Sequence, residues 1–175
     1  MLKGYKVVTR KDDKLVSYGY PELAYGAVVE YAIGVRTEPR KRYGPLAVFT
    51  KLKDAVYFAI CDISGCDLPA IQHYAQSTRL YACEYEPSRE ECLWRISRDF
   101  NPSTDRYQEY KNERDDLPTG SALADVVMLT KAIDISPAMD KLLYFRRSHA
   151  RFTPIDKFYE LAELVKEMAA IYEQR

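Results

Sequence analysis

Glu84 and Glu86 are the two residues whose spacing suggests chemistry most directly. A single residue separates them in the segment RLYACEYE, residues 79–86, whose alternating apolar and polar side chains are typical of a β-strand. Both carboxylates therefore lie on one face of that strand, where like charges can raise the pKa of one of them and allow general acid–base catalysis. The same spacing also fits a solvated strand edge, so catalysis by Glu84 or Glu86 is one of two open interpretations.

Basic side chains gather in two other segments of the chain. If the two segments converge, they would form a surface that binds phosphate, RNA or an acidic protein. The whole chain, however, has 26 basic and 26 acidic side chains, so its overall field cannot concentrate a polyanion. We therefore favour two separate solvated loops, with nucleic-acid binding as the alternative. The candidate anion-binding residues are Arg36, Arg40, Lys41, Arg42, Arg146, Arg147 and Arg151.

The four cysteines, Cys61, Cys66, Cys83 and Cys92, raise the question of a zinc site. Zinc sites usually use close pairs of cysteines on turns. Here Cys61 belongs to an apolar helical pattern and Cys83 to an apolar strand face, which is typical of buried thiols. The two histidines, His73 and His149, are far apart, and no phosphate-binding, nucleophile-elbow or dinucleotide glycine pattern is present. We therefore expect no metal site and no cofactor.

The segment 46–61, LAVFTKLKDAVYFAIC, is the clearest core-forming element. Its first four residues are an apolar run after Gly44-Pro45, which predicts an interior strand. The residues that follow place Ala55, Val56 and Ala59 on one face of a helix that is apolar nearly all round. Thr50 lies between the two elements, where its hydroxyl is predicted to cap the helix by accepting a hydrogen bond from a first-turn amide.

The remaining elements are arranged around this strand–helix pair. We predict further strands at residues 5–9, 15–18, 27–35, 79–86 and 124–133, and helices at 70–76, from Ser136, and at 154–173. Residues 89–97 fit either a helix or a short strand, and residues 100–120 form a long polar loop or insertion. The sequence thus predicts a single α+β domain over residues 1–175, with a mixed or mostly antiparallel sheet, a buried helix after the central strand and a long amphipathic C-terminal helix.

Residues 44–59, GPLAVFTKLKDAVYFA, followed by the strand LYACEYE, resemble the ADP-ribosyltransferase-type fold. In that fold a Gly-led strand ending in Phe-Thr precedes a helix rich in alanine and aromatic residues, and a Glu-x-Glu pair follows. The resemblance implies a transferase-like enzyme that uses Glu84 or Glu86. The Arg or His of the family's first strand and its Ser-Thr-Ser strand have no counterpart at matching positions. The chain is also similar to small proteins of unknown function that share a YKVV start and an LYACEYEPS-like strand, which implies no activity.

These observations together predict a non-catalytic binding or interaction domain of the kind that viruses and mobile elements encode. Fifteen tyrosines, the polar segment 100–120 and the amphipathic C-terminal pattern suit a surface for a protein partner. The alternatives are a divergent ADP-ribosyltransferase-like enzyme and an RNA- or nucleotide-binding protein. No secretory signal and no apolar run long enough to cross a membrane are found, so we expect a cytoplasmic protein with no membrane partner. The oligomeric state is not specified by the sequence.

Overall fold

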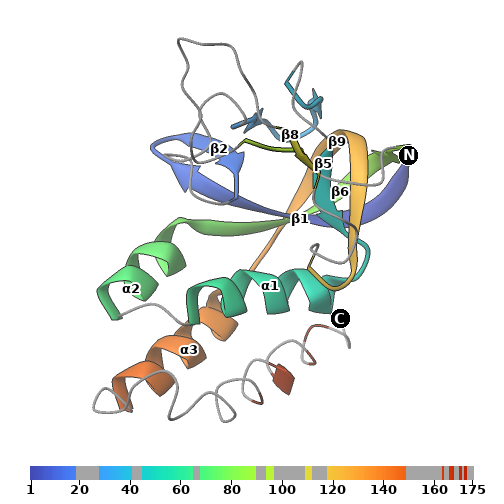
Figure 1. The fold of residues 1–175 in the computed structure, drawn as a ribbon. Coiled ribbons are helices and arrows are strands. Elements are labelled where there is room, and N and C mark those ends of the chain that lie inside the picture. The colour runs from blue at the N-terminus through green and yellow to red at the C-terminus, as the bar shows by residue number, and fades with distance from the viewer. Residues whose placement is uncertain are drawn as a thin grey trace.

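The computed structural model describes residues 1–18, 28–40, 45–64, 68–89, 94–96, 109–111 and 118–148, with the single residues 163, 166, 167, 170 and 172. This part of the chain forms one α+β domain. Its seven-stranded antiparallel sheet has three helices packed on one side, and a separate two-stranded sheet lies apart from them (Figure 1). The predicted fold class is confirmed.

The sheet begins with the predicted N-terminal hairpin. Strand β1, Leu2–Lys11, pairs in antiparallel fashion with β2, Lys14–Ser17, and Lys11 lies opposite Lys14. Asp12 in the connecting turn has a φ of 54°, a backbone conformation that Asp tolerates better than most residues. On its other edge β1 pairs over eight residues with β6, Thr78–Pro87. The predicted strand at 79–86 is therefore a central strand of the sheet.

Four of the strands close on themselves into a small barrel. Strand β5, Leu46–Phe49, and strand β6 each pair with both β1 and β9, Ser121–Ile133. The contact of β1 with β5 is the single pair Tyr5–Phe49. Gly4 allows this approach, because a Cβ atom at that position would lie 2.8 Å from the carbonyl oxygen of Phe49 and 3.0 Å from the ring of Tyr85.

The strand predicted at residues 27–35 is broken in the structure. Residue 27 lies outside the described residues, and the rest of the segment contains the short strand β3, Glu30–Tyr31. The next strand, β4, Arg36–Thr37, begins just after the predicted segment. Strand β3 pairs with β2, whereas β4 pairs with β9. Gly34 has a φ of 76°, and the amide of Val35 donates to the carbonyl of Ala32 at 3.2 Å. The apolar run suggested one strand, but this glycine turn moves the chain from one side of the barrel to the other.

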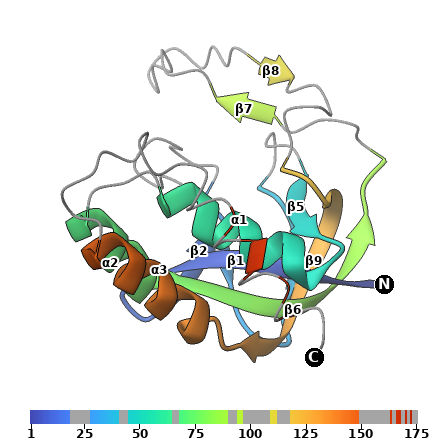
Figure 2. The same ribbon diagram turned by 90° about the horizontal axis from the view of Figure 1, so that it is seen from below.

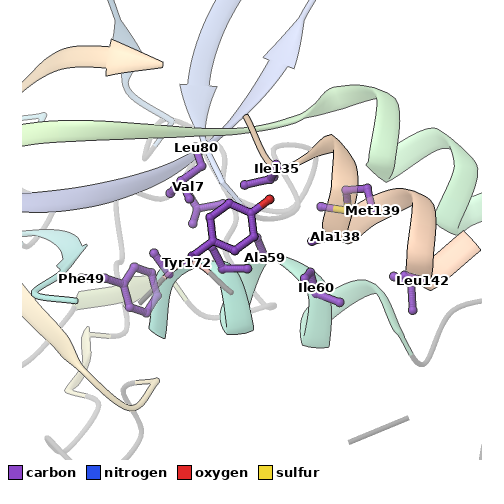
Figure 3. Packing of buried hydrophobic residues seen from close by; sticks show 12 residues of the cluster. Val7, Phe49, Ala59, Ile60, Leu80, Ile135, Ala138, Met139, Leu142 and Tyr172 are labelled. Carbon is purple, nitrogen blue, oxygen red and sulfur yellow. The ribbon is translucent and has the colours of Figure 1, made fainter. Parts of the chain in front are cut away.

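The helices cover part of the outer face of the barrel. Helix α1, Leu52–Ser64, follows β5 as predicted, and α2, Leu68–Ser77, and α3, Ser136–Ser148, pack beside it. The side chains buried between these helices and the barrel form the helix-side core (Figure 3). Its members are Val7, Phe49, Ala55, Val56, Ala59, Ile60, Leu80, Ile135, Ala138, Met139, Leu142 and Tyr172.

Thr50 connects β5 to α1 and also bonds a distant turn. Its hydroxyl donates a hydrogen bond to the carbonyl of Gly120 at 3.2 Å, and its amide donates to the same oxygen at 2.9 Å. These bonds tie the corner before α1 to the turn that precedes β9. A hydroxyl that donates in this way can still accept a hydrogen bond, so the predicted cap of α1 by Thr50 stays a prediction.

A second cluster of buried side chains lies inside the barrel, and we call it the barrel core. It includes Tyr81, Cys83 and Tyr85, which alternate along β6 and were predicted to share the buried face. Along β1 and β5, neighbouring residues face opposite ways, so that Val8 and Val48 belong to the barrel core while Val7 and Phe49 belong to the helix-side core. The full barrel core is Val8, Val29, Tyr31, Leu46, Val48, Tyr81, Cys83, Tyr85, Ala124, Val127 and Leu129.

Two predicted segments are described only in part. Residues 94–96 form strand β7, Trp94–Ile96, which pairs with β8, Glu109–Lys111, so the strand alternative holds for these residues of 89–97. Most of the predicted polar loop 100–120 and most of the predicted helix 154–173 lie outside the described residues. Tyr172 is described, and its side chain is buried in the helix-side core with its hydroxyl donating to the carbonyl of Asp134 at 3.0 Å.

Candidate functional site

Glu84 and Glu86 lie on the outer face of the barrel. Glu84 is opposite Lys3 of β1 and Met128 of β9, and Glu86 is opposite Val126 of β9. Both side chains are only partly buried. Their strand neighbours Tyr81, Cys83 and Tyr85 point the other way, into the barrel core, as the period of a strand requires.

Glu86 forms an ion pair with Arg36, which the sequence analysis had placed in a different candidate site. The Arg36 Nη2 atom lies 2.6 Å from the Glu86 Oε1 atom. Arg36 belongs to β4 and is opposite Met128, so the pair reaches across β9 between the two strands that flank it. About half of each side chain is exposed, with relative areas of 53% and 43%. Such an exposed pair stabilises a fold only slightly. Each of the two charged groups is the ion-pair partner of the other.

The other predicted basic residues are distributed over several elements. Arg40 is exposed shortly after β4, and Arg147 is exposed near the end of α3. Arg146 is in α3, but its side chain is outside the described part, as are Lys41, Arg42 and Arg151. Among the side chains that the structure describes, no contact joins Arg36 or Arg40 to Arg147. The structure therefore associates Arg36 with Glu86 and Arg147 with a separate groove.

That groove lies between α2 and α3, which run side by side at the end of the molecule away from β5 (Figure 2). It has a volume of about 350 Å³. We call it the α2–α3 groove, and the residues that line it are Gln72, Ala75, Gln76, Ser136, Met139, Asp140, Leu143 and Arg147. The contributions of α3 recur every three or four residues, so they form one stripe that faces α2 along the whole helix.

The α2–α3 groove combines an apolar floor with polar walls. Met139 belongs to the helix-side core and Ala75 and Leu143 pack against it, so the floor is continuous with that core. Gln72 and Gln76 carry side-chain amides, which can each donate and accept hydrogen bonds. From Ser136 to Arg147 the stripe spans twelve helical residues, and the eleven steps between them correspond to about 16 Å.

Tyr144 adds an exposed aromatic ring to α3 next to this stripe. It is 75% exposed, the largest value among the exposed large hydrophobic residues of the described chain. It lies one turn after Asp140 and directly after Leu143, both of which line the groove. Sequence reasoning missed the groove, although the apolar side of the predicted helix at 136 contained Met139 and Leu143. The groove requires α2 as its second wall, and helix pairing is not visible in a local pattern.

Lys6 of β1 is a charged residue that lies beside the barrel core and is only 7% exposed. Its Nζ atom donates to the carbonyl oxygen of Ala47 on β5 at 2.5 Å. The same atom lies 5.6 Å from the centroid of the Tyr31 ring, at a distance typical of a cation–π contact. Within the described part of the chain, no carboxylate lies within ion-pair distance of this ammonium group.

The titratable neighbours of Lys6 inside the barrel are held in their neutral forms. Burial raises the pKa of the Cys83 thiol to about 12, although the nearby Lys6 opposes this shift. Burial also raises the pKa of Tyr85, and the adjacent Cys83 adds to the rise. Cys83 is thus a free, buried thiol with little thiolate character at neutral pH. Sequence reasoning did not single out Lys6, although it shares a strand face with the apolar Val8.

Other kinds of site receive no support from the described residues. No three His, Cys, Asp or Glu side chains in that part of the chain gather as a metal site would require. No described helix is both long and apolar enough to cross a membrane. Comparison of the chain with protein-family models, with curated proteins and with solved structures found no match.

Proposed function

We propose that this chain is a non-catalytic, cytoplasmic binding domain that holds an extended segment of a protein partner in the α2–α3 groove. The observation that carries the proposal is the groove itself, a concave site of about 350 Å³ built from two helices. Clefts of this size that combine apolar surface with a few polar groups are the usual places where proteins bind ligands.

The chemistry of the groove favours a peptide as its occupant. The amides of Gln72 and Gln76 can bond both the N–H and the C=O groups of an extended backbone. The floor of Ala75, Met139 and Leu143 accepts one or two apolar side chains. Arg147 at one end can pair with a carboxylate of the partner.

The rim of the groove also suits a protein partner. Tyr144 is highly exposed beside the groove, and tyrosine is one of the residue types enriched in binding hot spots. Its large ring loses little conformational entropy when it is ordered at an interface. An exposed tyrosine next to a preformed groove therefore offers a partner both a contact and an anchor point.

Catalysis by the glutamate pair has less support. Glu86 is ion-paired with Arg36 at 2.6 Å, and both side chains are partly exposed to solvent. The cytoplasmic location is supported by the free, buried thiol of Cys83, which fits a reducing compartment.

The proposal can be tested by selecting peptides from a random dodecamer library on the immobilised protein. We expect selected peptides to bind with dissociation constants on the order of micromolar. Arg147→Glu should weaken peptides that carry a carboxylate by about tenfold or more, because it replaces an attraction by a repulsion. Lys141→Glu is the matched control, since Lys141 is exposed on the same helix but does not line the groove.

A second matched pair of variants tests the shape of the site. Gln76→Trp fills the groove from α2, whereas His73→Trp adds the same ring to an exposed position of α2 outside the groove. We expect the first variant to abolish peptide binding and the second to preserve it. Peptides that bind all four variants equally would refute the assignment of the groove. Failure to select any peptide, together with strong binding of RNA or DNA, would refute the protein-partner proposal.

A further inference from the structure

Lys6 carries a positive charge inside the barrel, and no described residue forms an ion pair with it. An ammonium group removed from water is costly unless it is paired and hydrogen-bonded. Lys6 is 7% exposed, and the described residues offer it one carbonyl and one aromatic ring. Neither of these carries a full negative charge.

A structural role explains one part of this arrangement. Strands β1 and β5 share only the pair Tyr5–Phe49 before β1 turns to pair with β2. Lys6 reaches from β1 to the carbonyl of Ala47 and so links the two strands where they separate. This link uses one of the three N–H groups of the ammonium, and the other two have no acceptor among the described residues.

Tyr31 supplies a second, independent observation. Its side chain is 5% exposed, and its hydroxyl has no hydrogen-bond partner within the described part of the chain. Buried hydroxyl groups without a partner are uncommon in proteins. The ring of Tyr31 lies under the Lys6 ammonium, so the unpaired hydroxyl and the incompletely paired cation belong to the same place in the barrel.

The neighbouring groups cannot provide the missing negative charge. Burial keeps the pKa of Cys83 at about 12, and it also raises the pKa of Tyr85, so both groups remain protonated at neutral pH. No carboxylate among the described residues lies within ion-pair distance of Lys6 either. An anion that accepts hydrogen bonds would complement both Lys6 and Tyr31.

We propose that Lys6 and Tyr31 form a binding site for one small oxyanion inside the barrel. One oxygen of the anion accepts from Lys6 Nζ, and another accepts from the Tyr31 hydroxyl. The carboxylate of a short organic acid and inorganic phosphate share this chemistry. The site is separate from the α2–α3 groove and does not depend on the function proposed for it.

The test measures the thermal unfolding midpoint as acetate or phosphate replaces chloride at constant ionic strength and pH 7. Because an anion that binds only the folded state stabilises it, the midpoint of the wild type should rise with anion concentration. Lys6→Met, which keeps the length of the side chain but removes its charge, should abolish this rise. Lys3→Met, on the same strand at an exposed position, should leave it unchanged.

Tyr31→Phe provides a variant that removes only the hydroxyl. It should require about tenfold more anion for the same rise, because it deletes one hydrogen bond to a charged group. A rise with acetate alone would assign the site to an organic acid, and a rise with phosphate alone would assign it to phosphate.

Three outcomes would overturn the proposal. Equal rises in the wild type and Lys6→Met would show a general effect of the salt. A flat response of the wild type to both anions would show that Lys6 serves only as the link to Ala47. Should Lys6→Met not fold, an unchanged anion response in Tyr31→Phe would also reject the site.

Discussion

The turn before β9 depends on a glycine whose replacement has a calculable cost. Gly120 has a φ of 78°, and its carbonyl oxygen accepts both hydrogen bonds from Thr50. A Cβ atom added there would lie 2.1 Å from Oδ2, 2.6 Å from Cγ and 2.8 Å from Cβ of Asp54 in the first turn of α1. Rotating the Asp54 side chain cannot relieve the last of these contacts, so the backbone of the turn or of the helix must move.

The expected magnitude follows from two separate terms. An alanine in a left-handed conformation costs about 1–2 kcal/mol, and overpacking a tight site adds about 1–3 kcal/mol. Gly120→Ala should therefore reduce the free energy of unfolding by about 2–5 kcal/mol. Gly34 is the matched control, because it has a φ of 76° but no atom within 4 Å of an added Cβ. Gly34→Ala should lose only about 1–2 kcal/mol.

Urea unfolding followed by circular dichroism measures both variants against the wild type. A double variant with Asp54→Ala should recover part of the loss caused by Gly120→Ala, because it removes the two shortest contacts but not the one with Cβ. Equal losses for Gly34→Ala and Gly120→Ala would refute the close contact of the turn with α1. A loss below about 0.5 kcal/mol for both would refute the left-handed turns as well.

Three further predictions concern the core and the surface. Burial raises the pKa of Cys83 from 9.0 to about 12, so the folded protein holds this proton more tightly than the unfolded chain. Stability should be unaffected by this group below pH 9 and fall by about 1.4 kcal/mol per pH unit between pH 9 and 12. Urea unfolding of the wild type and of Cys83→Ala at several pH values measures this fall, and an equal fall in both proteins would contradict the prediction. Phe49→Ala should lower the free energy of unfolding in urea by about 3–5 kcal/mol, because the ring is buried. Leu2→Ala is the control and should cost little, because Leu2 is exposed. An unchanged stability of Phe49→Ala would reject the assigned core. For labelled RNA or DNA, the logarithm of the affinity should fall with the logarithm of the salt concentration with a shallow slope of roughly −1 to −2, because Arg40 and Arg147 lie in separate parts of the fold. A steep slope that Arg40→Ala and Arg147→Ala each reduce by about one would instead indicate a nucleic-acid binder.

Several features of this protein could be predicted because they depend on neighbours in the sequence. The alternation of Tyr81, Cys83 and Tyr85 identifies the buried face of β6, since a strand turns its side chains to opposite faces with a period of two. The spacing of Ala55 and Val56 identifies the buried face of α1 in the same way. The broken strand at 27–35 shows the limit of this reasoning, because an apolar run does not reveal that Gly34 turns the chain to another partner strand.

The sequence by itself therefore determined the α+β class, the central strand–helix pair and the facing of individual strands. Only the tertiary structure decided which side chains meet across the barrel and between the helices. Lys6 meets Ala47 across 41 positions of sequence, and Arg36 meets Glu86 across 50. These contacts depend on how β1, β5, β6 and β9 close and on how β4 joins β9, and closure is a property of the whole sheet. Local periodicity contains no information about it, and for that reason the barrel cation and the α2–α3 groove emerged only from the fold.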